Sequence, residues 1–273
     1  MKIACIGEAM IELSFRGNIP SLGVAGDTLN TAIYLKRAAP NLQVDYLTRL
    51  GTDPFSTRIK TFIAAENIGT EAIETSQKRH PGIYAISNSE SGERTFTYWR
   101  AQSAARELFQ TADGAKFSAL NGYDVLYLSG ITLAILPSII RQQLLNFLKN
   151  SDKLIAFDSN YRPVLWPDTQ EARETINSFW EISHLVLPSL DDEMELFQES
   201  FETVQKRFAA YGSLGALKCG EKGPLSLGEP ISAPCYPASP TVVDTTAAGD
   251  SFNGAYLGAK LSGESQEKAL QKG

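Results

Sequence analysis

The sequence predicts an α/β fold in which a mainly parallel sheet carries helices on both faces, together with a small β lid. Short, almost wholly apolar segments alternate with helix-like segments along most of the 273 residues, which is typical of a parallel sheet buried on both sides. Residues 82–100 instead alternate polar and apolar side chains about a turn, which indicates a β-hairpin. Because no repeat or long linker divides the chain, we expect a single domain over residues 1–273.

The first half of the chain predicts two strand–helix pairs and then the hairpin. Apolar runs give strands over 3–13 and 44–51, and apolar positions three and four residues apart give helices over 27–39 and 54–67. The hairpin over 82–100 has its turn at Ser89-Glu90-Ser91-Gly92. Its tyrosine, tryptophan and arginine side chains are too amphipathic for a simple core. We therefore interpret it as a lid that projects from the sheet.

The second half continues the alternation without a further hairpin. Pro137 suits the first turn of a helix, because proline lacks an N–H group and the N–H groups of a first turn have no acceptor within the helix. Residues 223–244 contain several prolines and predict a short, irregular sheet edge. The expected strands lie at 125–131, 154–160, 184–190 and 214–220, and the expected helices at 137–150, 168–181, 191–198 and 247–262.

Composition argues for a protein that acts on small molecules inside the cell. The net charge of −6 disfavours nucleic acid or an anionic membrane as the main partner, because both reward a basic surface. The three cysteines show no metal-ligand spacing, and the first residues read as a strand rather than a leader. The apolar run at 125–137 is too short to span a bilayer. We expect a soluble, cytoplasmic protein.

The segment VDTTAAGDSF, residues 243–252, predicts chemistry at a helix start. The free N–H groups and partial positive charge of a helix N-terminus attract anions, and Ala247, Ala248 and Gly249 let a phosphate approach the backbone. Asp250 follows in the first turn, where it could take the proton of an attacking hydroxyl during phosphoryl transfer. We expect the helix dipole to lower its pKa and make it a weak base. The alternative is a tightly packed helix in which Asp250 only caps the backbone.

Two segments resemble the signatures of the ribokinase-like (PfkB) carbohydrate kinases. Residues 244–250 resemble the family motif Asp-Thr-x-Gly-Ala-Gly-Asp, with Ala247 in place of the first glycine. LGVAGDTLNTAIYLKR, residues 22–37, resembles the Gly-Gly-Asp-x-x-Asn segment, with Ala25 in place of the first glycine. Residues 50–53 match the next turn of the family. The resemblance covers nearly the whole chain and implies a ribokinase-like fold and an ATP-dependent sugar kinase.

The resemblance also implies where the nucleotide and the catalytic groups lie. Asp250 would be the catalytic base, with Ala247, Ala248 and Gly249 as the anion hole. Mg²⁺ is expected because phosphoryl transfer from ATP needs charge neutralisation. The place of the family's metal-linked Asn-x-x-Glu segment reads Ser189-Leu190-Asp191-Asp192, so no metal ligand is assigned. The ATP-binding residues would be Asn160, Arg162, Lys218, Gly220, Gly223, Ala247, Ala248 and Gly249.

Within the family, several stretches resemble the kinases of the sugar acid 2-keto-3-deoxygluconate, among them FDSNYRPVLW at 157–166. A substrate carboxylate is well matched by a planar guanidinium, and Arg100 lies at the end of the lid. The terminal hydroxyl of the sugar acid would be the acceptor. The substrate-binding residues would be Gly26, Asp27, Asn30, Tyr84, Tyr98, Arg100, Arg162 and Asp250.

Each of these assignments has an alternative. Asp27 could only cap the following helix, Tyr84 and Tyr98 could be an ordinary cross-strand pair, and Arg100 could be a solvated lid charge. The protein could instead be a fructokinase or ribokinase, or a catalytically silent sugar-binding member, since little sequence follows the signature helix. A dinucleotide oxidoreductase is disfavoured because no G-x-G-x-x-G follows the first strand. A homo-oligomer that pairs through the β lid is a further expectation.

Overall fold

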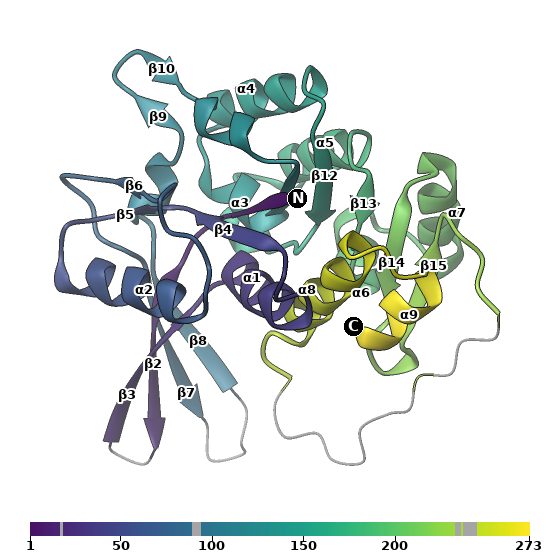
Figure 1. Cartoon of the computed structure of the whole chain (residues 1–273), viewed down its shortest axis with the longest axis horizontal. Helices are drawn as coiled ribbons and strands as arrows, with labels where there is room; N and C mark the ends of the chain where they lie inside the picture. Colours follow the sequence, from purple (N-terminus) through teal and green to yellow (C-terminus); the bar gives the residue numbers. More distant parts are fainter. Residues whose placement is uncertain (17–18, 89–93, 233–235, 237–244) are drawn as a thin grey trace.

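The structure is a computed structural model that describes residues 1–16, 19–88, 94–232, 236 and 245–273. A central seven-stranded sheet runs through the molecule (Figure 1). All neighbouring strands pair in parallel except the two that come last in the sequence, which form one edge of the sheet and are antiparallel. In spatial order the strands are β15 (Pro224–Leu227), β14 (Leu214–Lys218), β13 (Leu185–Val186), β12 (Leu154–Asp158), β11 (Val125–Ser129), β1 (Lys2–Ile6) and β4 (Gln43–Leu47).

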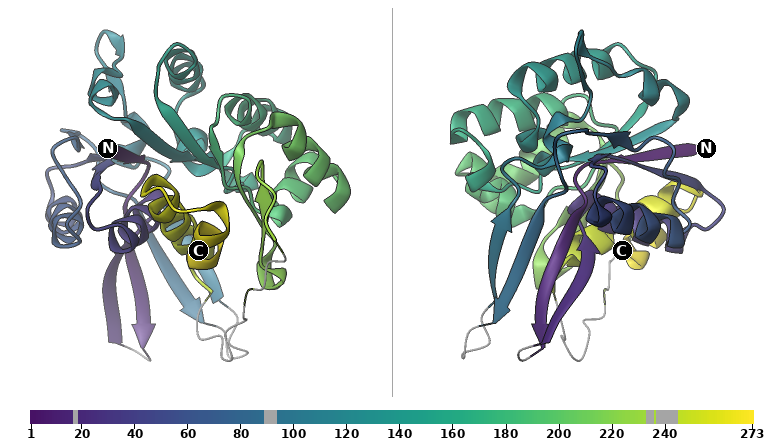
Figure 2. Two further views of the ribbon diagram at one scale, coloured as in Figure 1. Left: turned by 45° about the vertical axis from the view of Figure 1, so that its right-hand side comes forward. Right: turned by 90° about the vertical axis from the view of Figure 1, so that its left-hand side faces the viewer.

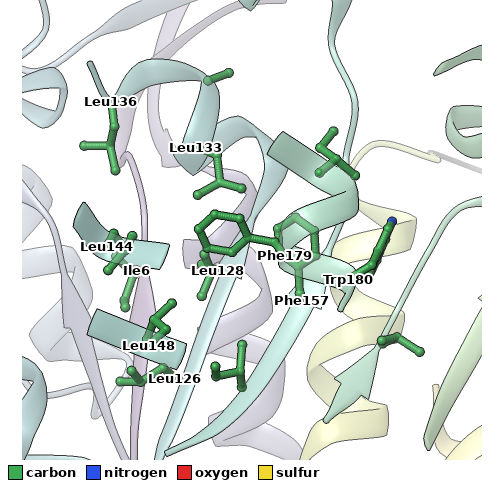
Figure 3. Packing of buried hydrophobic residues seen from close by; sticks show 14 of the residues in the cluster. Ile6, Leu126, Leu128, Leu133, Leu136, Leu144, Leu148, Phe157, Phe179 and Trp180 are labelled. Carbon is green, nitrogen blue, oxygen red and sulfur yellow. The ribbon is translucent and has the colours of Figure 1, made fainter. Parts of the chain in front are cut away.

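Helices cover both faces of this sheet, as predicted. One face packs against α1 (Asp27–Ala38), α2 (Pro54–Ala65), α8 (Ala248–Leu261) and α9 (Gln266–Lys272). The other packs against α3 (Gly130–Ile135), α4 (Ser138–Lys149), α5 (Thr169–Trp180), α6 (Leu190–Phe197) and α7 (Phe201–Tyr211). Alternation along the strands explains the two cores, because Ile3 and Cys5 of β1 point to the first and Ile6 to the second. Figure 3 shows Ile6 in the second core, where Phe157, Phe179 and Trp180 lie together.

The lid is a four-stranded sheet rather than a hairpin. Its strands are, in spatial order, β3 (Ile19–Ala25), β2 (Met10–Arg16), β7 (Ile83–Asn88) and β8 (Arg94–Trp99). The predicted pairing of β7 with β8 is confirmed, whereas its predicted turn at 89–92 lies outside the described residues. All four strands project from one edge of the molecule (Figure 2).

The single strand predicted over 3–13 is wrong. The chain leaves the central sheet at Gly7 and enters the lid at Met10, so one apolar run supplies strands to two sheets. A Cβ on Gly7 would lie 2.2 Å from Thr28 Oγ1, so this turn against α1 needs a glycine. An apolar run alone does not reveal such a change of sheet.

Other boundaries differ from the prediction for local reasons. The strand over 44–51 is β4 followed by the two-residue β5 (Arg49–Leu50), which pairs with β6 (Glu74–Thr75). The strand over 184–190 contains only β13, and the strand over 125–131 ends at Ser129, where α3 begins. Helices α3, α7 and α9 were not predicted. The remaining small elements are β9 (Gln110–Thr111), β10 (Gly114–Ala115), η1 (Ala104–Glu107), η2 (Ser118–Gly122), η3 (Pro163–Leu165) and η4 (Gly220–Lys222).

The helix predicted over 247–262 is confirmed as α8, which packs against α1. A Cβ on Gly254 would lie 2.5 Å from the carbonyl oxygen of Thr31, and one on Gly258 would lie 3.0 Å from Ala38 Cβ. The glycines of this helix therefore allow a close approach to α1. Among the described residues, no helix is long and apolar enough to cross a membrane.

Candidate active site

The predicted site residues line one cleft between the lid and the carboxyl ends of the central strands. The cleft has a volume of about 1020 Å³. This is the edge at which open parallel sheets bind ligands. It is lined by every residue that the sequence proposed: Gly26, Asp27, Asn30, Tyr84, Tyr98, Arg100, Asn160, Arg162, Lys218, Gly220, Gly223, Ala247, Ala248, Gly249 and Asp250.

The start of α8 faces this cleft and differs in two ways from the expected anion hole. The N–H of Ala248 donates to the carbonyl of Thr245 at 3.1 Å, so it is used within the turn. Gly249 N–H has no acceptor among the described residues, as is usual in a first helical turn. Ala247 precedes the helix with a φ of 60°, a left-handed conformation that favours glycine. The methyl group of Ala247, which stands where the family motif has its first glycine, therefore adds backbone strain.

Asp250 has a raised pKa, so the expected lowering by the helix dipole is wrong. Burial raises the pKa of its carboxyl to about 7, and the neighbouring carboxylates of Asp27 and Asp158 raise it as well. The hydrogen bond from Asn30 Nδ2 to Asp250 Oδ2, at 3.0 Å, and the charge of Lys218 act in the opposite direction. A carboxylate with a pKa near neutrality is a stronger base than an ordinary aspartate.

Asp27 does not cap α1, because Gly26 holds the cap position and Asp27 already lies in the first turn. Its Oδ2 accepts hydrogen bonds from Ser129 Oγ and, at 3.1 Å, from Asn160 Nδ2. The capping alternative is therefore wrong. These bonds join α1, β11 and the loop after β12 at the floor of the cleft.

Tyr84 and Tyr98 face each other across the lid strands, as predicted. They are directly paired residues whose ring centroids lie 5.7 Å apart. The hydroxyl of Tyr84 donates to Glu12 within the lid, so that proton is already used. Tyr98 is 49% exposed and makes the more accessible surface.

Arg100 is a buried side chain at the junction of the lid and the core, not a solvated lid charge. It is 8% exposed, and its Nε and Nη2 both donate to one oxygen of Glu8, Nε at 2.9 Å. Glu8 is 1% exposed, and its Oε1 has no donor among the described residues. Arg100 therefore reaches the cleft with one carboxylate partner already in place.

The opposite wall of the cleft carries Lys218 and two glycines with positive φ. Lys218 Nζ donates to Asp158 Oδ2 at 2.7 Å and to Asn253 Oδ1 at 3.1 Å. Gly220 and Gly223 have φ values of 56° and 77°, conformations that other residues rarely adopt. Gly220 begins the short η4 turn and Gly223 follows it, and both line the cleft.

Acidic side chains gather near Arg162 on the same wall. Arg162 Nη1 lies 3.4 Å from Asp192 Oδ1, and Asp192 Oδ2 accepts from the N–H of Tyr161. Burial raises the pKa of Asp192 to about 6. In the part of the chain that the structure describes, no group of three or more acidic, histidine or cysteine residues is placed to hold a metal ion.

Sequence reasoning missed Glu8, Asp158, Asn253 and Asp192 as site residues. Two of them could have been found from the sequence. Asp158 ends β12, at the edge where ligands bind, and Asn253 lies one helical turn after Asp250 on the same helix. The signal at Glu8 was hidden, because the strand was predicted to run straight through it. Trp166, in the segment 157–166 that resembles the sugar-acid kinases, is buried beneath Arg141 and serves packing.

Comparison with known sequences gives full-length matches. A model of the pfkB family of carbohydrate kinases matches residues 1–273. The 2-dehydro-3-deoxygluconokinase of Escherichia coli (strain K12) is 39% identical over 290 residues, which cover 100% of this chain and 92% of the relative. The enzyme of the same name from Dickeya dadantii (strain 3937) is 40% identical over 288 residues, covering 99% and 91%.

Solved structures share the fold. A PfkB protein from Polaromonas sp. JS666 matches with a TM-score of 0.84 and 24% identity, covering 99% of this chain and 92% of that one. A fructokinase from Vibrio cholerae O395, solved with fructose, ADP and calcium ion, matches with a TM-score of 0.81 and 22% identity, covering 99% and 87%. The fold, the cleft and the full-length family match agree, and this chain belongs to the pfkB family of carbohydrate kinases.

Proposed function

We propose that the protein transfers the γ-phosphoryl group of ATP to the terminal hydroxyl of 2-keto-3-deoxygluconate, which gives 2-keto-3-deoxy-6-phosphogluconate and ADP. The observation that carries the chemistry is Asp250, a carboxyl with a pKa of about 7 in the first turn of α8, where Gly249 N–H has no acceptor within the described part of the chain. The names of the full-length relatives support the substrate, since 2-dehydro-3-deoxygluconate is the same sugar acid. ATP as the donor supports the expected cytoplasmic location.

In this proposal Asp250 acts on the attacking hydroxyl, and the backbone at the start of α8 acts on the phosphoryl group. The carboxylate of Asp250 accepts the proton of the attacking hydroxyl as the oxygen–phosphorus bond forms. Asn30 holds the carboxylate by its 3.0 Å hydrogen bond. The N–H of Gly249 and the helix dipole stabilise the negative charge on the phosphoryl oxygens. Ala248 contributes less than expected, because its N–H is used by Thr245.

The second wall of the cleft suits the nucleotide. Lys218, Asn160 and Arg162 are polar or basic, and Gly220 and Gly223 leave the backbone open to the cleft. When bound, Mg²⁺ would neutralise phosphate charge during the transfer. The residues fit such an ion, because Mg²⁺ in kinases is held largely by phosphates and water with one or two carboxylates. Asp191 and Asp192 line this wall and would supply them.

The lid end of the cleft suits a sugar acid better than a neutral sugar. Nη1 of Arg100 has no acceptor among the described residues, although Nε and Nη2 are taken by Glu8. A substrate carboxylate at that edge would make a charge-assisted hydrogen bond. Asp27, Asn30 and Tyr98 lie where the hydroxyls of the sugar chain would pass. A fructokinase or ribokinase activity is the second candidate, supported by the fold shared with the Vibrio cholerae fructokinase.

A coupled ADP-release assay tests the proposal. The purified protein would be assayed with ATP and Mg²⁺ on 2-keto-3-deoxygluconate, gluconate, fructose and ribose, and kcat/KM compared. We expect the keto acid to exceed the neutral sugars by at least about 10-fold, since a charged hydrogen bond contributes about 1.5–3 kcal/mol. A neutral sugar with the highest kcat/KM would refute the sugar-acid assignment. No turnover with any sugar, together with no heat on titration with ATP–Mg²⁺, would support a silent sugar-binding protein.

We also propose that two copies pair through the outer face of the lid. Strand alternation places Phe15, Leu22 and Trp99 on the face opposite Tyr84 and Tyr98. Phe15, Leu22 and Trp99 are 44%, 41% and 59% exposed, an apolar surface that a partner would cover. Light scattering during gel filtration should give the mass of a dimer, and Trp99→Glu should give a monomer. A monomeric wild type at micromolar concentration would contradict this proposal.

A further inference from the structure

A buried polar cluster connects the nucleotide wall of the cleft to the start of α8. Its centre is Asp158, which is 3% exposed and accepts three hydrogen bonds. Lys218 Nζ donates to Asp158 Oδ2 at 2.7 Å and Asn253 Nδ2 donates to the same oxygen at 2.6 Å. The backbone N–H of Asn160 donates to Oδ1 at 3.1 Å. Strands β12 and β14 and helix α8 thus meet at one carboxylate.

Asn253 joins this cluster to α8. It is fully buried, one turn after Asp250 on α8. Its amide nitrogen donates to Asp158 and, at 3.2 Å, to the hydroxyl of Tyr127, while its amide oxygen accepts from Lys218 at 3.1 Å. The arrangement needs two N–H donors and one acceptor on the same side chain, which is what an amide supplies. The ammonium group of Lys218 is therefore fixed directly to the helix that carries the base.

The third hydrogen of that ammonium group has no acceptor in the described ranges of the chain and is left for the cleft. A lysine has three donors, and two are used by Asp158 and Asn253. Lys218 Nζ lies 3.8 Å from the point where a Cβ on Gly249 would be, and the N–H of Gly249 has no acceptor among the residues that the structure describes. The side chain of Lys218 is 13% exposed and lines the cleft. A phosphoryl group held by Gly249 N–H would be within reach of this charge.

We propose that Lys218 is a catalytic residue that contacts the phosphoryl group in transit, and that Asp158 and Asn253 are positioning residues that aim it. This inference rests on the proposed kinase function but not on the choice of sugar. A fixed cation at this place acts on charge that develops during the transfer, which is the most effective use of a charged group in catalysis. Binding of the nucleotide before the transfer depends on it less.

The same cluster acts on Asp250. The groups that face Asp250 are Asp27 and Asn30 of α1, Asp158 of β12 and Lys218 of β14, and the pKa values of Tyr84 and Tyr127 also respond to it. Asp158 raises the pKa of Asp250, and Lys218 lowers it. Removing each group should therefore move the pH dependence in opposite directions. A merely structural role would not do this.

The test compares two site variants with two matched controls. Lys218→Met removes the cation, with Lys222→Met as a control on an exposed lysine of the same segment. Asp158→Asn places an amide against three donors. Its control is Asp45→Asn, because Asp45 is also buried and also pairs with a lysine, Lys2 at 3.0 Å, outside the cleft. The sugar used is whichever one the wild type phosphorylates, so a wrong sugar assignment leaves the test intact.

For Lys218→Met we expect kcat to fall roughly 10- to 150-fold, the loss of one charged hydrogen bond. The dissociation constant of ADP, measured by calorimetry, should change less than about 3-fold. A kcat within about 3-fold of wild type would overturn the catalytic role, and an ADP affinity reduced as much as kcat would show ground-state binding instead. Lys222→Met should match the wild type in both measurements.

The pH profile of kcat/KM for the sugar tests the positioning role. Its acid limb should move to higher pH in Lys218→Met and to lower pH in Asp158→Asn, each by about one unit. Asp45→Asn should lose thermal stability as Asp158→Asn does, with the limb unmoved. Limbs that move together, or that stay in place in both site variants, would refute the proposal even if both variants lose activity.

Discussion

Replacing Arg100 by methionine should damage the protein in two separable ways. The side chain pairs with Glu8 inside the junction of lid and core, and it faces the cleft. Arg100→Met therefore removes both a structural partner and the proposed contact with the substrate carboxylate. Adding Glu8→Gln to the same chain removes the charge that the first change leaves behind, so the double variant separates the two roles.

The structure sets the size of the stability effect. Glu8 is 1% exposed, and its Oε1 already has no donor among the described residues, so Arg100→Met leaves a buried carboxylate without its ion pair. Breaking a buried pair from one side costs about 3–5 kcal/mol. For a chain of this size, that lowers the melting temperature by roughly 6–20 °C. Because Glu8→Gln replaces the stranded charge by a neutral amide, the double variant should recover at least about half of the loss.

Activity should not recover with stability. At a temperature where all variants are folded, kcat/KM for 2-keto-3-deoxygluconate should fall roughly 10- to 150-fold in both Arg100→Met and the double variant. A neutral sugar should lose little. The assay is the ratio of the two specificity constants beside the melting temperature from calorimetry. If Glu8→Gln restores the sugar-acid ratio along with stability, Arg100 acts only through the fold and our reasoning about its substrate contact fails.

Three further outcomes follow from the start of α8. Asp250→Asn should keep the fold and ADP affinity but lower kcat by roughly 10²–10⁴, the usual effect of a positioned base; since Ala247 holds the cap position of α8 and Asp250 does not cap the helix, more than about a tenth of wild-type kcat would refute its role as the base. In the wild type, Asp250 must be ionised to accept a proton and its pKa is raised to about 7, so kcat/KM should rise with pH through about 7 and level off above it; an acid limb near pH 4 would contradict the burial of this group. Ala247→Gly should stabilise the protein by about 0.5–1 kcal/mol. It relieves roughly 1–2 kcal/mol of strain in the left-handed conformation and loses about 0.4–1 kcal/mol because glycine raises the entropy of the unfolded chain. Denaturant unfolding that shows no gain in the free energy of unfolding would show that Ala247 is not strained.

The elements that sequence could predict are those whose signal is local. Strands buried on both faces, such as β11 and β12, read as continuous apolar runs, and α8 was marked by its small residues and first-turn aspartate. The path through Gly7 to Met10 was missed, because leaving one sheet for another depends on contacts with Thr28 far along the chain. Sequence could not show that Arg100 was already paired, since its partner Glu8 is 92 residues away.

The pKa of Asp250 shows the same limit for electrostatics. The first turn of a helix gives a local reason to lower the pKa of an aspartate. Burial and two carboxylates from other elements outweigh that effect, and these depend on how α1, β12 and α8 come together. Sequence motifs therefore located the residues of the cleft, while the charges around them had to come from the structure.

The packing of α8 on α1 has a consequence for how the protein is made. The two helices are more than 200 residues apart, yet Gly254 and Gly258 fit against Thr31 and Ala38, and Asn30 reaches Asp250. During synthesis at roughly 5–20 residues per second, α1 leaves the ribosome long before its partner exists. The part of its surface that α8 covers, at Thr31, Leu35 and Ala38, must wait for most of the chain. A contact between two helices so far apart in the sequence forms slowly, and apolar surface stays exposed until it forms. We therefore expect nascent chains halted before α8 to bind chaperones and to have no phosphotransferase activity.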